Sequence, residues 1–133
     1  MKKMGIINSE IAKVIAAMGH TDTLVIVDSG YPIPPNVHRI DLSLRSGFPS
    51  ILDVLQEVEK ELAVEKLTCA AESAHYCSSL IEEAVAMFPG ASSESVPHAE
   101  FKDRARFAAA IIRTGECTAY SNIILQAGVT FPL

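Results

Sequence analysis

Apolar residues along the chain change repeatedly between helical and strand-like spacing, and these changes predict the order of the elements. Near the start, apolar side chains recur three and four positions apart between a capping Asn8 or Ser9 and a terminating Gly19, which predicts a helix. The next apolar run, Leu24 to Val27, is short and continuous as in a buried strand, and Asp28 follows it before a turn. The predicted buried face of the helix carries Ile11, Val14, Ile15 and Met18.

The middle of the chain continues this alternation. Residues 37–44 alternate apolar and polar side chains, which predicts a half-buried strand. Ser50 begins a predicted helix with one apolar face over residues 51–62, and residues 64–70 predict a third strand. The tetrapeptide Ser79-Leu80-Ile81-Glu82 is interpreted as a capping box that opens another helix, which would stop at the following Pro-Gly pair.

The last third of the chain predicts one more helix and two closing strands. Residues 91–97 are interpreted as a loop with a short strand, and Phe101, Ala105 and Ala108 mark the helix. Residues 109–116 and 122–128 predict strands joined by a turn through Gly115. Strands that alternate with helices indicate an α/β fold, here a single-domain three-layer sandwich over residues 1–133 with a mixed, mostly parallel sheet of about six strands.

Composition and charge narrow the classes of partner. A net charge of -5 argues against nucleic acid and anionic membranes, which attract clustered positive charge. The start, MKKMGIINSE, lacks the apolar stretch of a secretory signal, and no segment approaches the length of a membrane span. Three cysteines without a CxxC pair predict free, mostly buried thiols in a cytoplasmic protein. Because 49% of the residues are hydrophobic, we expect a homo-oligomer.

His20 and Asp28 flank the first predicted strand and are the first candidates for chemistry. Ligands of α/β sheets bind beyond the carboxyl ends of strands, where Asp28 lies, and an imidazole can shuttle protons near neutral pH. Each residue also has a purely structural interpretation, since His20 could cap the preceding helix and Asp28 could form an Asx turn. Nucleotide-binding motifs and metal-binding spacings are absent, and a metal site assembled from His20, Asp28 and His98 is disfavoured.

Four blocks of the sequence together resemble the D-ribose pyranase family, which is related to the fucose mutarotases. The blocks are NSEIAKVIAAMGHTDTLVIVDSGYPIP, RIDLSL with the following GFPS, HAEFK, and IIRTGECTAYSNIILQAGVTF. Residues 73–95 match the family weakly. Tyr31, where members more often carry leucine, and Ser121, where alanine is common, depart from the pattern and affect the fit of the substrate rather than the type of reaction.

The resemblance implies interconversion of the β-pyranose and β-furanose forms of D-ribose. This reaction moves protons between the anomeric hydroxyl, the ring oxygen and a second hydroxyl, so it requires neither cofactor nor metal, and a histidine is suited to carry the proton. The family's motif makes His20 the general acid. It makes the remaining site residues ligands of the sugar, namely Asp28, His98, Lys102, Tyr120 and Asn122.

Each of these expected sugar ligands also has a purely structural interpretation. His98 could be a helix cap or a surface residue, Tyr120 and Asn122 could be turn residues, and Lys102 could be a solvated charge. A fucose mutarotase and a non-catalytic sugar-binding or transport-accessory protein are the alternative functions. The resemblance also implies a ring-like homo-oligomer, a pentamer or a decamer of paired pentamers, with pockets completed across subunit boundaries.

Overall fold

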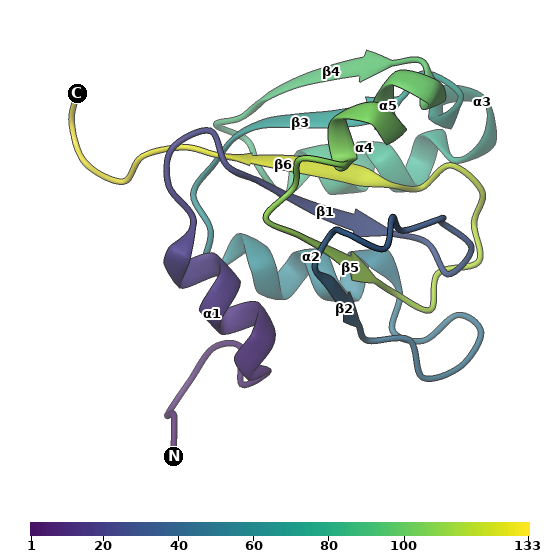
Figure 1. The fold of residues 1–133 in the computed structure, drawn as a ribbon. Coiled ribbons are helices and arrows are strands. Elements are labelled where there is room, and N and C mark those ends of the chain that lie inside the picture. Colours follow the sequence, from purple (N-terminus) through teal and green to yellow (C-terminus); the bar gives the residue numbers. More distant parts are fainter.

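The computed structural model describes residues 1–133 and contains one six-stranded sheet flanked by helices (Figure 1). No helix is both long enough and apolar enough to cross a membrane. In chain order, the elements are α1 (Ser9–Ala17), β1 (Thr23–Val27), β2 (Arg39–Asp41), α2 (Ile51–Glu59), β3 (Val64–Ala70), α3 (Ser73–Tyr76), α4 (Ser78–Ala86), β4 (Ser92–Val96), α5 (His98–Ala105), β5 (Ala110–Arg113) and β6 (Ile123–Ala127).

The strands lie in the order β2-β5-β1-β6-β3-β4, and β6 alone runs antiparallel to both of its neighbours. The other pairs are parallel, which confirms the predicted mixed, mostly parallel sheet. Five strands therefore end where β6 begins, and we call this the carboxyl end of the sheet. The same five strands begin where β6 ends, at the amino end of the sheet.

Two apolar clusters fill the spaces between the layers. Strand β1 alternates between them: Leu24 and Ile26 contact the cluster with α1, α2 and α4, whereas Val25 and Val27 face the cluster with α5. The second cluster also contains apolar side chains of the proline-containing loop that follows β1. Because both faces of β1 are covered, its sequence is a continuous apolar run, as in other central strands.

Local capping explains where the first two helices begin. The Asn8 side chain accepts a hydrogen bond from the Ile11 N–H at 3.1 Å and thereby starts α1. At α2, Ser50 and Asp53 form a reciprocal capping box, with both hydrogen bonds at 3.1 Å. Both helices were expected at these places.

The structure corrects three details of the prediction. The second strand is limited to β2, because the Asp41 carboxylate accepts a hydrogen bond from the Ser43 N–H at 2.9 Å and turns the chain. The capping box expected at residues 79–82 is wrong, since α4 begins at Ser78 directly after the unpredicted helix α3 and its N-cap residue, Cys77, makes no side-chain capping bond. The last helix, α5, ends before Ala108.

The closing strands β5 and β6 are both present, but β1 separates them in the sheet. Their connection, residues 114–122, therefore crosses the carboxyl end of β1, and the Thr114 N–H and hydroxyl both donate to the Val27 carbonyl oxygen, at 3.0 and 2.8 Å. The cysteines are free as expected, with Cys69 and Cys77 buried and Cys117 exposed.

Candidate sugar-binding site

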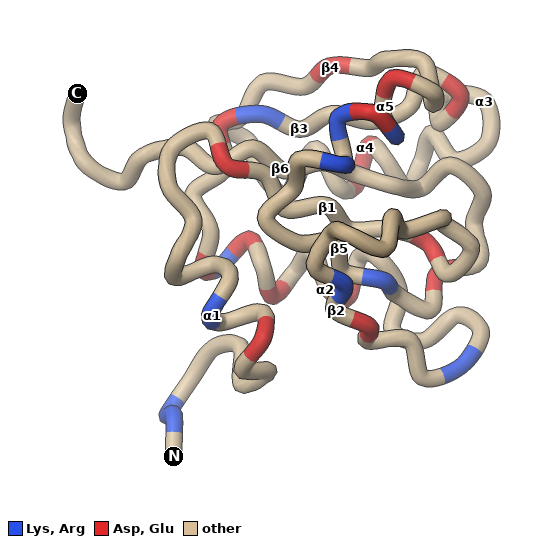
Figure 2. Tube along the Cα trace, viewed as in Figure 1, with Lys and Arg blue, Asp and Glu red and all other residues tan.

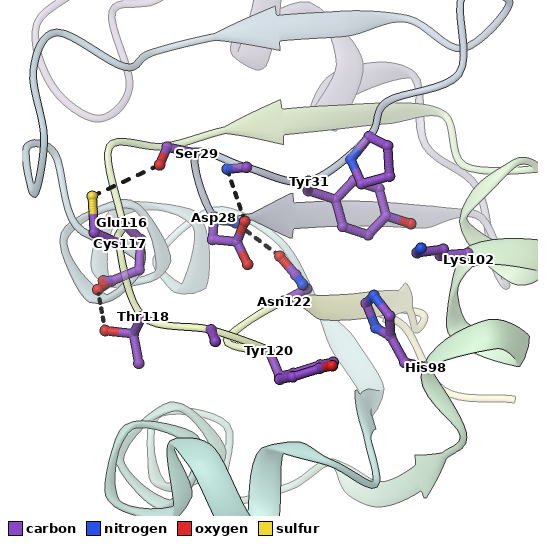
Figure 3. Close-up of a pocket in the computed structure, with 13 residues that line it drawn as sticks. Asp28, Ser29, Tyr31, His98, Lys102, Glu116, Cys117, Thr118, Tyr120 and Asn122 are labelled. Atoms are coloured by element: carbon purple, nitrogen blue, oxygen red, sulfur yellow. Dashed lines mark hydrogen bonds between the residues drawn. The ribbon is translucent and has the colours of Figure 1, made fainter.

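A pocket of about 600 Å³ lies at the carboxyl end of the sheet (Figure 3). The turn after β1, the start of α5 and the segment between β5 and β6 form its walls. Because β6 runs antiparallel to β1, the segment that leads into β6 lies beside the turn that follows β1. The side chains that carry polar groups into this lining are Asp28, Ser29, Tyr31, His98, Lys102, Glu116, Cys117, Thr118, Tyr120 and Asn122.

Asp28 and Asn122 form the floor of the pocket, where the end of β1 meets the start of β6. The Asp28 N–H donates to the Asn122 side-chain oxygen at 2.8 Å, and Asn122 is only 2% exposed. The Asp28 carboxylate accepts from the Gly30 N–H at 2.9 Å, so the residue makes the Asx turn and lines the pocket as well. Burial raises the pKa of Asp28, although hydrogen bonds from Gly30 and Asn122 partly oppose that shift.

Tyr120 forms a wall of the pocket and has a left-handed backbone conformation, with φ of 61°. Its carbonyl oxygen accepts hydrogen bonds from the Ser73 hydroxyl at 2.6 Å and from the Cys77 thiol at 3.4 Å. Its ring lies 4.9 Å from that of Tyr76. The unpredicted helix α3 and its end thus hold Tyr120 in a conformation that an isolated chain rarely adopts.

His98, the first residue of α5, presents its imidazole to the pocket within a group of aromatic rings. The Tyr120 ring lies edge-on at 5.0 Å, Tyr31 lies edge-on at 6.3 Å, and Phe101 stacks at 6.1 Å. The Nδ1 atom is buried without a hydrogen-bond partner. Burial, followed by the positive charge of Lys102, lowers the pKa of His98, so its imidazole is held neutral near neutral pH.

Lys102 follows His98 by one helical turn and lines the same pocket. The neighbouring arginines are paired, because Arg104 of α5 contacts Glu94 and Glu100 at 2.6 and 2.8 Å and Arg106, directly after α5, lies 3.9 Å from Asp103. Figure 2 shows this mixture of basic and acidic residues on α5. The Lys102 ammonium forms no ion pair within the chain and remains available to a ligand.

Glu116 and its neighbours were not expected in the site. The Glu116 carboxylate accepts hydrogen bonds from the Ile51 N–H at 3.1 Å and from the Thr118 hydroxyl at 2.8 Å, so it fastens the pocket segment to the start of α2. Between Glu116 and Thr118 in the sequence, the Cys117 thiol contacts the Ser29 hydroxyl at 3.8 Å. The run of polar residues in TGECT, after a buried strand, was the available signal for this wall.

His20 does not line this pocket. It precedes β1 at the amino end of the sheet, and the five residues of the strand place it roughly 17 Å from the Asp28 end. Its Nε2 hydrogen donates to the Glu65 carboxylate at 2.9 Å rather than to carbonyls of α1, so the helix-capping interpretation is wrong. Asp28 and His98 are brought together but His20 is not, and no group of three metal-binding side chains exists in the structure.

These features define an α/β protein with a polar pocket for a small ligand at the carboxyl ends of its strands. The chain matches the model of the RbsD / FucU transport protein family over residues 1–130. It is 53% identical over 131 residues to the D-ribose pyranase of Bacillus cytotoxicus, covering 98% of this chain and 100% of that protein. The chain therefore belongs to the RbsD / FucU family.

Solved structures agree with this assignment. The structure of Bacillus subtilis RbsD complexed with D-ribose has a TM-score of 0.95 and 46% sequence identity, over 98% of this chain and 100% of that one. The structure of FucU from Bifidobacterium longum has a TM-score of 0.74 and 26% identity, over 94% and 97% of the two chains.

Proposed function

We propose that this protein is a D-ribose pyranase, an isomerase that interconverts the β-pyranose and β-furanose forms of D-ribose. The observation that carries the proposal is the set of groups at the pocket: an anionic acceptor in Asp28, an unpaired cation in Lys102, and a neutral imidazole in His98 beside the Tyr120 ring. Such groups suit a small polyol, whose hydroxyls both donate and accept hydrogen bonds.

The chemistry requires proton transfers only. Opening the ring takes the proton from the anomeric hydroxyl and delivers one to the ring oxygen, and closure onto another hydroxyl reverses both transfers. Asp28, His98, Lys102, Tyr120 and Asn122 would bind and orient the sugar. His20 would be the general acid that protonates the ring oxygen.

Since His20 and the pocket lie far apart within a single chain, we propose that a neighbouring subunit supplies His20 to the pocket. The apolar C-terminal tail supports this arrangement, because Phe131 is 66% exposed and lines a surface pocket together with His20. The tail extends away from the body of the chain in Figure 1. Burial of this tail on a second copy would bring His20 to an intersubunit site, as in a ring-like pentamer or a decamer of paired pentamers.

We further propose D-ribose over a 6-deoxyhexose as the substrate, because the relatives named D-ribose pyranase are 50 to 53% identical to this chain, against 26% for the FucU structure. A cytoplasmic location also belongs to the proposal, since the three cysteines are free thiols.

Saturation-transfer NMR with D-ribose and L-fucose in parallel tests the function. We expect this protein to accelerate exchange between the pyranose and furanose signals of ribose. Faster anomer exchange of fucose alone would assign the protein to the fucose mutarotases. Ribose binding without faster exchange would assign it to non-catalytic sugar-binding proteins.

A further inference from the structure

Strand β3 contains a bulge at Glu65, at the amino end of the sheet. The pairing with β6 steps from Val64 opposite Ala127 to Lys66 opposite Gln126, which leaves Glu65 without a partner residue. A bulge redirects the side chain of the extra residue, and bulges are frequent beside functional sites. Here the bulge turns the Glu65 carboxylate toward the loop that precedes β1.

Both carboxylate oxygens of Glu65 have a specific partner. One oxygen accepts a hydrogen bond from the Gln126 side-chain amide at 2.7 Å, and the other accepts from Nε2–H of His20 at 2.9 Å. A Cβ atom at Gly128 would lie 3.2 Å from the Cβ of Glu65, so the absence of a side chain there leaves Glu65 its space. Gln126 and Gly128 both belong to the QAG sequence at the end of β6.

Specific hydrogen bonds also fix the loop that contains His20. Gly19 and Asp22 close a turn in which the Gly19 N–H donates to the Asp22 carboxylate at 2.8 Å. Thr21 has φ of 74°, which is a strained conformation for a β-branched residue, and its N–H donates to the Ala127 carbonyl at 3.0 Å. Strain of this kind persists where the surroundings fix the backbone, and it recurs at functional sites.

We propose that Glu65 is a positioning residue for His20: it binds Nε2–H, sets the orientation of the imidazole, and leaves Nδ1 to exchange the proton with the sugar. This inference rests on the proposed function, in which His20 is the general acid. Nδ1 of His20 makes no hydrogen bond within the chain, so it is the nitrogen available to a ligand. Glu65 itself does not contact the substrate in this arrangement.

The proton balance follows from this orientation. The doubly protonated imidazole gives its Nδ1 proton to the ring oxygen as the C–O bond breaks, while the Nε2 proton stays on the hydrogen bond to Glu65. The anomeric hydroxyl loses its proton to water as the carbonyl forms, and the carbonyl oxygen regains a proton from water when the new ring closes. The neutral ring then takes up, at Nδ1, the proton released by the hydroxyl that closes the new ring. Hydrogen bonds from Gln126 and His20 hold the pKa of Glu65 below its usual range, so the carboxylate stays charged and stabilises the cationic imidazole.

The test compares Glu65→Ala and Glu65→Gln with Glu10→Ala. Glu10 is the matched control, because it lies 3.8 Å from His38 in a second surface pair of histidine and carboxylate. Saturation-transfer NMR over a range of ribose concentrations gives kcat and KM for ring exchange. In Glu65→Ala we expect kcat to fall about 10- to 100-fold with KM within about twofold of the wild type, as for loss of an oriented acid. Glu65→Gln, which keeps an acceptor oxygen, should lie between.

Side-chain ¹H–¹⁵N spectra give a second readout that needs no activity. The neutral His20 imidazole should carry its proton on Nε2 in the wild type and in Glu10→Ala, and should become a mixture of tautomers in Glu65→Ala. If Glu65→Ala disturbs folding, Gln126→Ala removes only the support of the carboxylate and should shift the same signals partway.

Wild-type kcat together with unchanged His20 signals in Glu65→Ala would overturn the proposal. A change in KM without a change in kcat would also overturn it, since that would make Glu65 part of ribose binding. If the wild-type protein itself fails to accelerate ribose exchange, the proposed function fails, whereas the imidazole spectra still decide whether Glu65 orients His20.

Discussion

His20 and Asp28 lie at opposite ends of strand β1, with the imidazole at the amino end of the sheet and the carboxylate at the carboxyl end. A hydrogen bond fixes each residue in place. Nε2–H of His20 donates to the Glu65 carboxylate at 2.9 Å, and the Asp28 N–H donates to the Asn122 side-chain oxygen at 2.8 Å. Local rearrangement of the loops cannot bring the two groups together, because the strand between them is buried. A reaction that uses both groups on one sugar therefore requires two chains.

His20→Ala should abolish the accelerated ring exchange and leave the fold intact. Loss of a general acid typically costs about 10²- to 10⁴-fold in rate. The side chain is 42% exposed, so little packing is removed, and the effect on the free energy of unfolding should be within about 1 kcal/mol. Exchange NMR and a thermal melt followed by circular dichroism measure the two quantities. A folded mutant with the wild-type exchange rate would exclude His20 as the acid.

Asp28→Asn should weaken ribose binding by about tenfold, as expected for loss of hydrogen bonds to a charged group, without lowering stability. The folded state raises the pKa of Asp28, so it favours the protonated form and the charge at neutral pH is a cost to folding. Asparagine removes the charge and keeps an oxygen for the Gly30 N–H. Calorimetric titration and the melting temperature test both parts, and wild-type affinity would leave Asp28 with its turn-forming role alone.

Ribose affinity should decrease on acidification, in part because the His98 imidazole that lines the pocket changes from neutral to cationic. The folded state lowers the pKa of this residue, so the neutral imidazole stabilises the fold above about pH 6.5, and this contribution is lost as the pH falls through the lowered pKa. Lys102 favours the neutral form, and Glu72 and Asp28 oppose it. His98→Gln in an Asp28→Asn background, which also removes the titration of the Asp28 carboxylate, should flatten the decrease measured between pH 7 and 5. A decrease that persists unchanged in this double mutant would rule out His98 as its source.

The sequence was most informative where local signals and burial agree. The apolar run at Leu24 to Val27 and the Asn8 and Ser50 caps predicted elements that the structure contains, because each depends on neighbours within a few residues. Helix α3 and the start of α4 were missed because no side-chain cap marks them and tertiary contacts to Tyr120 hold α3 in place.

In the candidate site, too, local signals predicted single residues, whereas the contacts between them depend on the tertiary arrangement. Asp28 and Asn122 follow from the ends of predicted strands, whereas their contact depends on β6 lying beside β1, an arrangement that periodicity alone does not specify. The role of Glu116 is still less visible, since its partner Ile51 lies 65 positions away in the chain. The bulge that aims Glu65 at His20 likewise depends on the register between two strands.

Activity should survive exhaustive chelation. Asp28, His98, Glu116 and Cys117 line the pocket, but no three metal-binding side chains in the structure are grouped to hold an ion, and the proton transfers proceed through side chains alone. Exchange NMR before and after dialysis against EDTA measures the effect, and the expected change in rate is within error. Loss of activity that one specific metal restores would contradict this prediction and would point to a site shared between subunits.

Mixed oligomers provide the sharpest test of a shared site. If one subunit supplies His20 and its neighbour supplies Asn122, chains carrying His20→Ala and chains carrying Asn122→Ala, each inactive alone, should regenerate intact sites after they are unfolded and refolded together. In a random mixture of equal parts, about a quarter of the sites would combine both wild-type groups, so about a quarter of the wild-type exchange rate should return. A chain carrying both substitutions, refolded with either single mutant, is the matched control and should restore no activity. Recovery is impossible if each chain builds its own site, so a mixture without activity, or a monomer by light scattering, would show that His20 acts within one chain or not at all.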